Sequence, residues 1–276
     1  TTNNMRFRGW AATAPSPATI QASPTLPWEG ARALTAGVTV GVAAAWAALW
    51  LWAGSGSAHL LGHDRLAIEG LPAMAGLMAG WALMTVAMML PASMPMITWF
   101  HGVAGGRSRR GTMVLVLVGG FLLSWMVFGA GVHMGDWALH TAAARFPWMS
   151  SDGFAFGPVV LVLAGVYQFT PLKQRCLARC CAVPRRMTSE RWGAEERPAR
   201  AAFAMGIREG AWSVGCCWAL MLLMAAAGMS SLAHMLAVGT VMATETVDKG
   251  HRFRTPLGVT LIVAGIVSFG LGAFSA

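Results

Sequence analysis

The chain of 276 residues is 56% hydrophobic and only 11% charged, with a mean hydropathy of +0.56. Soluble domains carry roughly 25% charged residues, so this composition excludes an ordinary soluble globular protein and favours an integral membrane protein. The net charge of +9 would suit a nucleic-acid partner, but the charge lies in short segments between apolar runs, which excludes that class.

Seven apolar runs that reach or approach the length of a bilayer span follow one another along the chain. We expect an all-α fold, a polytopic transmembrane helical bundle, with spans at about 33–54, 71–99, 112–134, 155–172, 211–228, 231–247 and 256–275. Residues 1–32 are polar and Pro-rich. We expect them to form a mobile cytoplasmic segment without a removable signal peptide, ahead of a seven-span domain at 33–276.

The basic residues predict how these spans are oriented. Of the 20 Lys and Arg, 18 lie in four alternate segments, at 1–32, 100–111, 173–210 and 248–255. The segments on the other side hold only Arg65 and Arg145. By the positive-inside rule the N-terminus lies inside and the C-terminus outside. The chain then belongs in the bacterial inner membrane, with an inner charged loop at about 173–210.

The second run combines a methionine stripe with two prolines. Met74, Met78 and Met88 fall on one helical face. Each of Pro91 and Pro95 removes a backbone donor and frees a carbonyl one turn earlier, so we expect a break or kink between positions 87 and 95. Methionine fills irregular gaps in cores and also binds soft metal ions, and both interpretations of the stripe stay open.

The fourth run ends at Pro171, which predicts a helix stop or kink. Cys176, Cys180 and Cys181 follow it, just inside the expected membrane surface. If a helix resumes after the proline, Cys176 and Cys180 share a face because they are four residues apart.

The fifth run opens with Gly206 and Gly210, whose spacing allows tight helix packing, as Gly37 and Gly41 do in the first run. The adjacent Cys216 and Cys217 follow. One helical face collects Ser213, Cys217, Met221 and Met224. Neighbouring positions on a helix diverge by about 100°, which disfavours a direct bridge between the two cysteines.

All five cysteines fall at the inner side of the expected topology, where a reducing compartment disfavours structural disulfides. Thiolates and thioethers select Cu(I), zinc or iron–sulfur centres. Because consecutive elements are often neighbours, the two cysteine groups are expected to approach each other. The expected ligands are Cys176, Cys180, Cys216 and Cys217, with Met94 or Met221 as thioether partners. Packing thiols or redox chemistry would explain the same residues.

Further polar residues suggest other roles. Met74, Met78 and His234 would line an approach to the site from the outer side. His59 and His63 form a ligand pair if their loop is helical, although a solvated loop explains them equally well. Glu245 is an intramembrane acid and therefore a functional candidate, unless it snorkels to pair with Lys249 one turn on.

Three motifs between residues 70 and 250 carry a family resemblance. They are Trp-Ala-Leu-Met-Thr-Val-Ala-Met-Met-Leu-Pro at 81–91, Tyr-Gln-Phe-Thr-Pro-Leu-Lys at 167–173 with Cys176, and Gly-Cys-Cys-Trp-Ala-Leu-Met at 215–221 with Gly228 and Met229. With these motifs the chain resembles the bacterial predicted metal-binding integral membrane proteins, a family of unassigned activity. The resemblance implies a metal site on the cysteines. The family pattern often has another Cys at the place of Ser213 and Glu-Lys at the place of Glu245-Thr246, so one expected ligand is missing here.

We therefore expect an inner-membrane protein that binds a soft metal ion, Cu(I) in preference to zinc, for handling or transfer. Its partners would be the lipid bilayer and a metal-carrying protein or a larger membrane complex. A non-catalytic accessory subunit or assembly factor, and a membrane thiol oxidoreductase, are the alternatives. The sequence has no nucleophile triad and no phosphate-binding Gly-rich loop, which weighs against a hydrolase or an ATP-driven pump.

Overall fold

The computed structural model describes residues 28–53, 66–104, 109–145, 156–180, 192, 196–226, 232–247 and 254–275, and all regular elements within these ranges are helices. The predicted all-α fold is thus confirmed for the described part of the chain. The helices are α1 (Trp28–Ala53), α2 (Leu66–Ala92), α3 (Met94–Val103), α4 (Arg110–Arg145), α6 (Phe156–Gln168), α7 (Pro171–Cys180), α9 (Pro198–Ala226), α10 (Leu232–Val247) and α11 (Arg254–Ser275).

Each of the seven apolar runs overlaps at least one described helix, but the helix ends differ from the ends of the runs. The segment at 173–210, expected as a loop, contains most of α7 and the first turns of α9. Of the segment expected to be mobile, residues 28–32 already belong to α1, and residues 1–27 lie outside the described ranges.

Among the residues that the structure describes, three helices are long and apolar enough to cross a membrane, at Arg32–Ala53, Met74–Ala92 and Arg110–Leu139. The apolar helices at Gly157–Gln168 and Arg254–Gly270 are shorter. Large apolar side chains face outward along several helices, including Trp50, Leu115, Val127, Val263 and Ile266. A surface of this kind is uncommon on soluble monomers and suits contact with an apolar surrounding.

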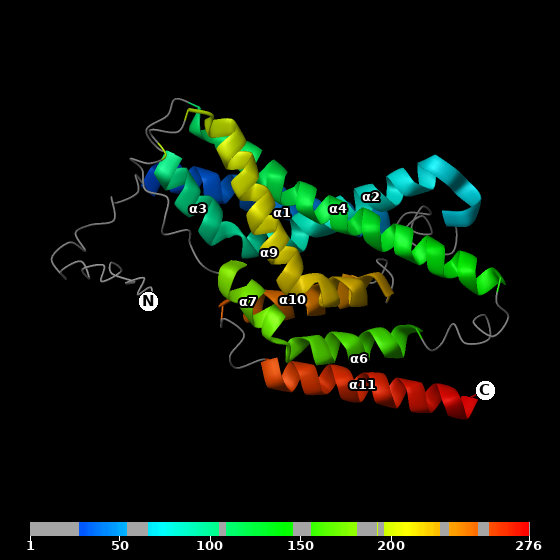
Figure 1. Cartoon of the computed structure of the whole chain (residues 1–276). Coiled ribbons are helices and arrows are strands. Elements are labelled where there is room, and N and C mark those ends of the chain that lie inside the picture. The colour runs from blue at the N-terminus through cyan, green and yellow to red at the C-terminus, as the bar shows by residue number, and fades with distance from the viewer. Residues whose placement is uncertain are drawn as a thin grey trace, which may run out of the picture.

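The tightest helix contact joins α4 to α9, which cross in Figure 1. A Cβ atom added to Gly206 would collide with the backbone carbonyl of Leu117, and one added to Gly120 with that of Phe203. The Ser124 hydroxyl on α4 also donates a hydrogen bond of 3.0 Å to the Ile207 carbonyl on α9. Glycine therefore lets the two backbones touch, and the close packing predicted for the Gly206 region is confirmed.

The predicted close contact at Gly37 and Gly41 is not seen, because a Cβ on either glycine would have no neighbour within 4 Å. A second tight pair instead consists of α6 and α11, which lie side by side and antiparallel (Figure 1). Gly165 faces Ile262 and Gly265 faces Val162 across this contact. The C-terminal helix is thus held to the rest of the fold mainly through α6.

The break predicted in the second run is confirmed at Ser93. The α2 helix ends at Ala92, Ser93 forms a turn whose amide bonds to the Leu90 carbonyl at 3.1 Å, and α3 begins at Met94. Pro95 stands in the first turn of α3, where a missing amide donor costs nothing because no partner exists there. The two prolines thus convert one long apolar run into two helices.

Candidate metal centre

The α7 helix presents the first cysteine pair. Pro171 begins this helix, so the chain resumes helical structure directly after the predicted stop. Cys176 is buried and Cys180, one turn later, is half-buried. Both belong to the buried cluster that also contains Cys216 and Cys217. The expectation that Cys176 and Cys180 share a face is therefore met.

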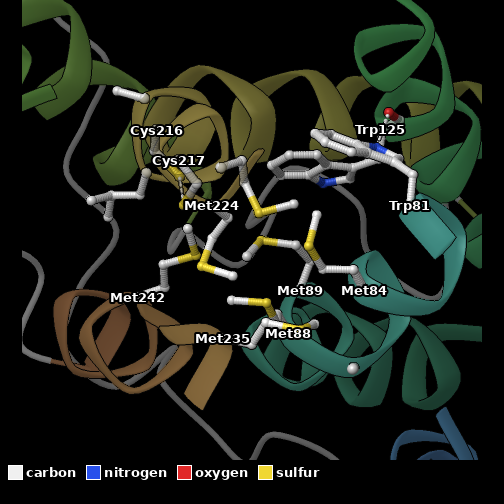
Figure 2. Packing of buried hydrophobic residues seen from close by; sticks show 14 of the residues in the cluster. Trp81, Met84, Met88, Met89, Trp125, Cys216, Cys217, Met224, Met235 and Met242 are labelled. Atoms are coloured by element: carbon white, nitrogen blue, oxygen red, sulfur yellow. Dashed lines mark hydrogen bonds between the residues drawn. The ribbon is translucent and has the colours of Figure 1, made fainter. Parts of the chain in front are cut away.

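The α9 helix supplies the second pair in an arrangement that the sequence did not predict. The sulfur atoms of Cys216 and Cys217 are 3.2 Å apart, as the dashed line in Figure 2 marks. The expectation that the two side chains diverge is wrong, because rotation about χ1 brings neighbouring sulfur atoms together although their Cβ atoms diverge. A disulfide stays disfavoured for another reason: adjacent Cα atoms are about 3.8 Å apart, below the roughly 4.4–6.8 Å that disulfides need.

The two cysteine pairs meet where α7 packs on α9. The Cys176 sulfur would be 2.7 Å from a Cβ atom at residue 215, so only the glycine that stands there leaves it room. The Cys180 thiol forms a side-chain hydrogen bond with Cys216. The predicted approach of the two groups is thus seen in the structure, with Gly215 as the residue that permits it.

The thiols on α7 differ in acidity. Burial raises the pKa of Cys176, and the nearby Cys180 raises it further. The hydrogen bond with Cys216 lowers the pKa of Cys180, although burial opposes this effect. Cys180 is therefore the more readily ionised of the two, and a thiolate is the form that binds a metal.

The Tyr167 side chain fixes the same region and was not singled out from the sequence. Its hydroxyl donates a hydrogen bond to the Gly215 carbonyl, and its ring meets the Trp218 ring edge-on at 4.8 Å. Tyr167 thus connects the end of α6 to α9 beside the thiols. It is the chain's only tyrosine and lies within the motif at 167–173, which was the available signal.

Glu245 forms a buried ion pair with Lys173, a partner that the sequence did not suggest. The Lys173 ammonium lies 2.9 and 2.8 Å from the two carboxylate oxygens, and both side chains are buried. Lys249 lies outside the described residues. The available signal was that Lys173 and Glu245 occupy the inner ends of two expected spans and so the same depth.

The other predicted ligands differ in whether they belong to the buried cluster that contains the thiols. Met221 is fully buried in the cluster with the thiols, whereas Met94 begins α3 and belongs to neither buried cluster. Met78 packs against the cluster that contains the thiols, Met74 is half-buried on the preceding turn, and His234 is exposed on α10. Cys181, His59 and His63 lie outside the described residues.

Within the described ranges, no three His, Cys, Asp or Glu side chains are arranged to hold a metal ion. The thiols approach one another in pairs, with Cys216 as the shared member. A three-ligand site would therefore require a third thiol to move inward, or a thioether from the surrounding methionines.

Comparison with known proteins shows a match to a family. A family model described as "PpoB2: Copper chaperone" matches residues 78–268. This range covers α7, α9 and α10, and with them all four described cysteines. The expected relation to a metal-binding family is thus confirmed in its general form. No curated protein matches the chain. No solved structure matches it either.

Proposed function

The chain belongs to the PpoB2 copper chaperone family, and from this membership we propose that it is an integral membrane protein that binds Cu(I) between α7 and α9 and hands it on. The observation that supports this proposal most directly is the meeting of four thiols at one helix contact. Cys176 and Cys180 come from one side, and Cys216 and Cys217 from the other. Copper is the cargo of the protein.

The donor set suits Cu(I) better than harder ions. Soft thiolate and thioether ligands select Cu(I), while carboxylate and water ligands suit Mg²⁺ or Ca²⁺. Glu245, the buried acid on α10, accepts two hydrogen bonds from Lys173, and Glu209 on α9, the buried acid whose charge acts on Cys180, lies 4.0 Å from Arg208. Zinc, the other soft candidate, prefers four ligands in a tetrahedron. Cu(I) also accepts two or three ligands, and the thiols, which contact one another in pairs, suit such a low coordination number better than a tetrahedron.

Simple geometry limits how the thiols could act. If two sulfur atoms bind the same metal ion, each at about 2.3 Å, the two sulfur atoms are at most about 4.6 Å apart. The Cys216 and Cys217 sulfurs, at 3.2 Å, lie well inside this limit. At that separation the sulfur–metal–sulfur angle is close to 90°, which leaves the opposite side of the ion open for a third ligand. Cys180, which already contacts Cys216, is the thiol best placed to fill it.

We propose the same seven-span topology that the charge distribution predicts, with the N-terminus and the cysteine site on the inner side of the cytoplasmic membrane. Three of the helices have the length and composition for spanning, and the apolar outer surface suits lipid. An ion bound at α7 would then be at the cytoplasmic face. A soluble metal-carrying protein on that side, or a copper enzyme being assembled in the membrane, is the proposed partner.

The proposal is tested by titrating the purified, reduced protein in detergent with Cu(I) in the presence of a competing Cu(I) chelator. Cys217→Ser should lower the affinity by a hundredfold or more, because a hydroxyl is a poor ligand for a soft ion. Cys216→Ser should have a similar effect. Cys181→Ser, which removes a thiol outside the proposed set, is the matched control and should bind like the wild type.

Two results would contradict the proposal. The first is the absence of stoichiometric Cu(I) binding by the wild-type protein. The second is an equal, small effect of all the cysteine substitutions, which would assign the thiols to packing. Stable co-purification with other membrane subunits, without copper, would favour the accessory-subunit alternative.

A further inference from the structure

Seven buried methionines lie together beside the thiols, and we name them the methionine cluster. They are between 0% and 6% exposed and all belong to the core that contains the cysteines. Three helices contribute them: Met84, Met88 and Met89 from α2, Met221 and Met224 from α9, and Met235 and Met242 from α10. Only part of this set lies on the methionine stripe visible in the sequence.

The side chains of the cluster converge on one volume. These methionines belong to one buried cluster, and in Figure 2 the labelled ones from α2, α9 and α10 surround the same region of the core. Trp81 and Trp125 stand along one side of this group. The Trp81 indole donates a 2.9 Å hydrogen bond to the Trp125 carbonyl, which fixes that ring in place. Thioethers from three separate helices therefore point inward to a common place.

The chemistry of the cluster matches a small soft monocation. A thioether carries no charge and has no proton to lose, so several can surround Cu(I) without leaving a net negative charge in an apolar core. Glu245 lies one turn beyond Met242 on α10 and is paired with Lys173, so the two opposite charges largely compensate each other.

The cluster is continuous with the thiol site along one helix face. Cys217, Met221 and Met224 follow at steps of four and three residues on α9, so they lie on the same face. With a rise of 1.5 Å per residue, Cys217 and Met224 are about 10 Å apart along the axis. Met221 lies between them and is fully buried. An ion leaving the thiols would therefore meet thioethers at successive turns.

We propose that the methionine cluster is a second Cu(I) site, made of thioethers alone, that exchanges copper with the thiol site through Met221. The inference rests on the proposed copper function and adds a separate location and ligand class to it. Ligand exchange moves Cu(I) from sulfur to sulfur without any change of oxidation state. The thiol site binds Cu(I) more tightly because thiolates carry a negative charge, and the methionine cluster is the neighbouring site of lower affinity.

The test uses Cu(I) stoichiometry and ligand spectroscopy on the purified full-length protein. The wild type should bind two Cu(I) ions, one of which gives the ultraviolet charge-transfer absorption of a copper–thiolate bond. The triple variant Met84→Leu, Met89→Leu and Met224→Leu should bind one ion and keep that absorption. Leucine nearly preserves volume, and such exchanges usually cost less than about 1.5 kcal/mol each, so the fold should persist.

A matched control removes three other buried methionines. Met96, Met113 and Met205 lie in the second buried cluster, away from the thiols. Their replacement by leucine should leave two ions bound. The converse variant, in which Cys176, Cys180, Cys216 and Cys217 are all replaced by Ser, should keep one weakly bound ion without the thiolate absorption. X-ray absorption of that sample should show sulfur neighbours.

The outcomes separate this inference from the proposed function. One thiolate-bound ion in the wild type, unchanged by the cluster variant, overturns the thioether site and leaves the thiol site intact. Loss of the second ion in both methionine variants also overturns it, because the effect would then not be specific to the cluster. No copper in the wild type would remove both proposals.

Discussion

The Lys173 ammonium on α7 lies between the two carboxylate oxygens of Glu245 on α10, with both side chains 2% exposed. The two residues are 72 positions apart, so the pair ties together helices that are distant in sequence. It also lies one turn from Cys176 on α7 and one turn from Met242 on α10. The ion pair is therefore a direct contact between the helix that carries Cys176 and Cys180 and a helix that carries buried methionines.

Removing one charge of this pair should destabilise the fold strongly. Glu245→Gln leaves the ammonium of Lys173 buried without a counter-charge, and breaking a buried pair in this way costs about 3–5 kcal/mol. Denaturation in detergent, followed by tryptophan fluorescence, measures the loss. The double variant Lys173→Met with Glu245→Met should recover most of the stability, because it leaves no buried charge. A single variant as stable as the wild type would contradict the role of the pair.

A Cβ atom at residue 215 should disturb the thiol site without removing any ligand. In Gly215→Ala the new methyl group would lie 2.7 Å from the Cys176 sulfur, so the side chain of Cys176 or α7 itself has to move. Overpacking of this kind costs about 1–3 kcal/mol, and we expect Cu(I) affinity to fall about tenfold or more. Chelator competition measures the change. Gly76→Ala, whose Cβ would have no neighbour within 4 Å, is the control and should bind as the wild type does.

The contact between α4 and α9 predicts a contrast between two glycines. Gly206→Ala would drive a methyl group into the Leu117 carbonyl, which is backbone and cannot rotate away. We expect a loss of at least about 1–3 kcal/mol in unfolding free energy. Gly119→Ala on α4 faces open space and should be neutral or stabilising by up to about 1 kcal/mol, because alanine favours the helix. Equal stability of the two variants would refute the backbone contact.

The orientation of the chain predicts which side of the membrane the α7 thiols face. In a variant whose only cysteine is Cys180, a membrane-impermeant maleimide should fail to label intact cells whose outer membrane is permeabilised. Labelling should appear after the inner membrane is ruptured, because Cys180 is half-buried and not fully enclosed. The positive-inside rule places this residue in the cytoplasm. Rapid labelling from outside would reverse the proposed topology.

Local sequence signals predicted the helices and their interruptions well. The prolines at 91, 95 and 171 mark the two helix breaks because proline lacks an amide donor, and this restriction acts within one turn of the chain. The tight packing at Gly206 was likewise predictable from a local property, because glycine has no side chain to keep two helices apart. Gly37 and Gly41 have the same spacing without a partner, since spacing permits a close contact but does not supply the other helix.

Long-range contacts were harder to predict. The approach of the two cysteine groups was predictable because they lie at the facing ends of consecutive spans. The 3.2 Å contact between Cys216 and Cys217 was not, because it depends on side-chain rotation, which a helical wheel ignores. The pairing of Lys173 with Glu245 depends on how α7 and α10 are placed, which residue spacing does not define. The methionine cluster was missed for a similar reason, because it assembles only when three helices meet.

The backbone contact between Leu117 and Gly206 has a consequence for how the protein is made. Synthesis proceeds at about 5–20 residues per second, and the two positions are roughly 90 residues apart, so α4 leaves the ribosome several seconds before α9 can cover it. During that interval Gly120 and Ser124 lie on a face that α9 has not yet covered. The α9 cysteines arrive only when this face can be closed, and Glu245 arrives later still. The nascent chain thus completes the α4 side of its tightest helix contact before the second cysteine pair is present.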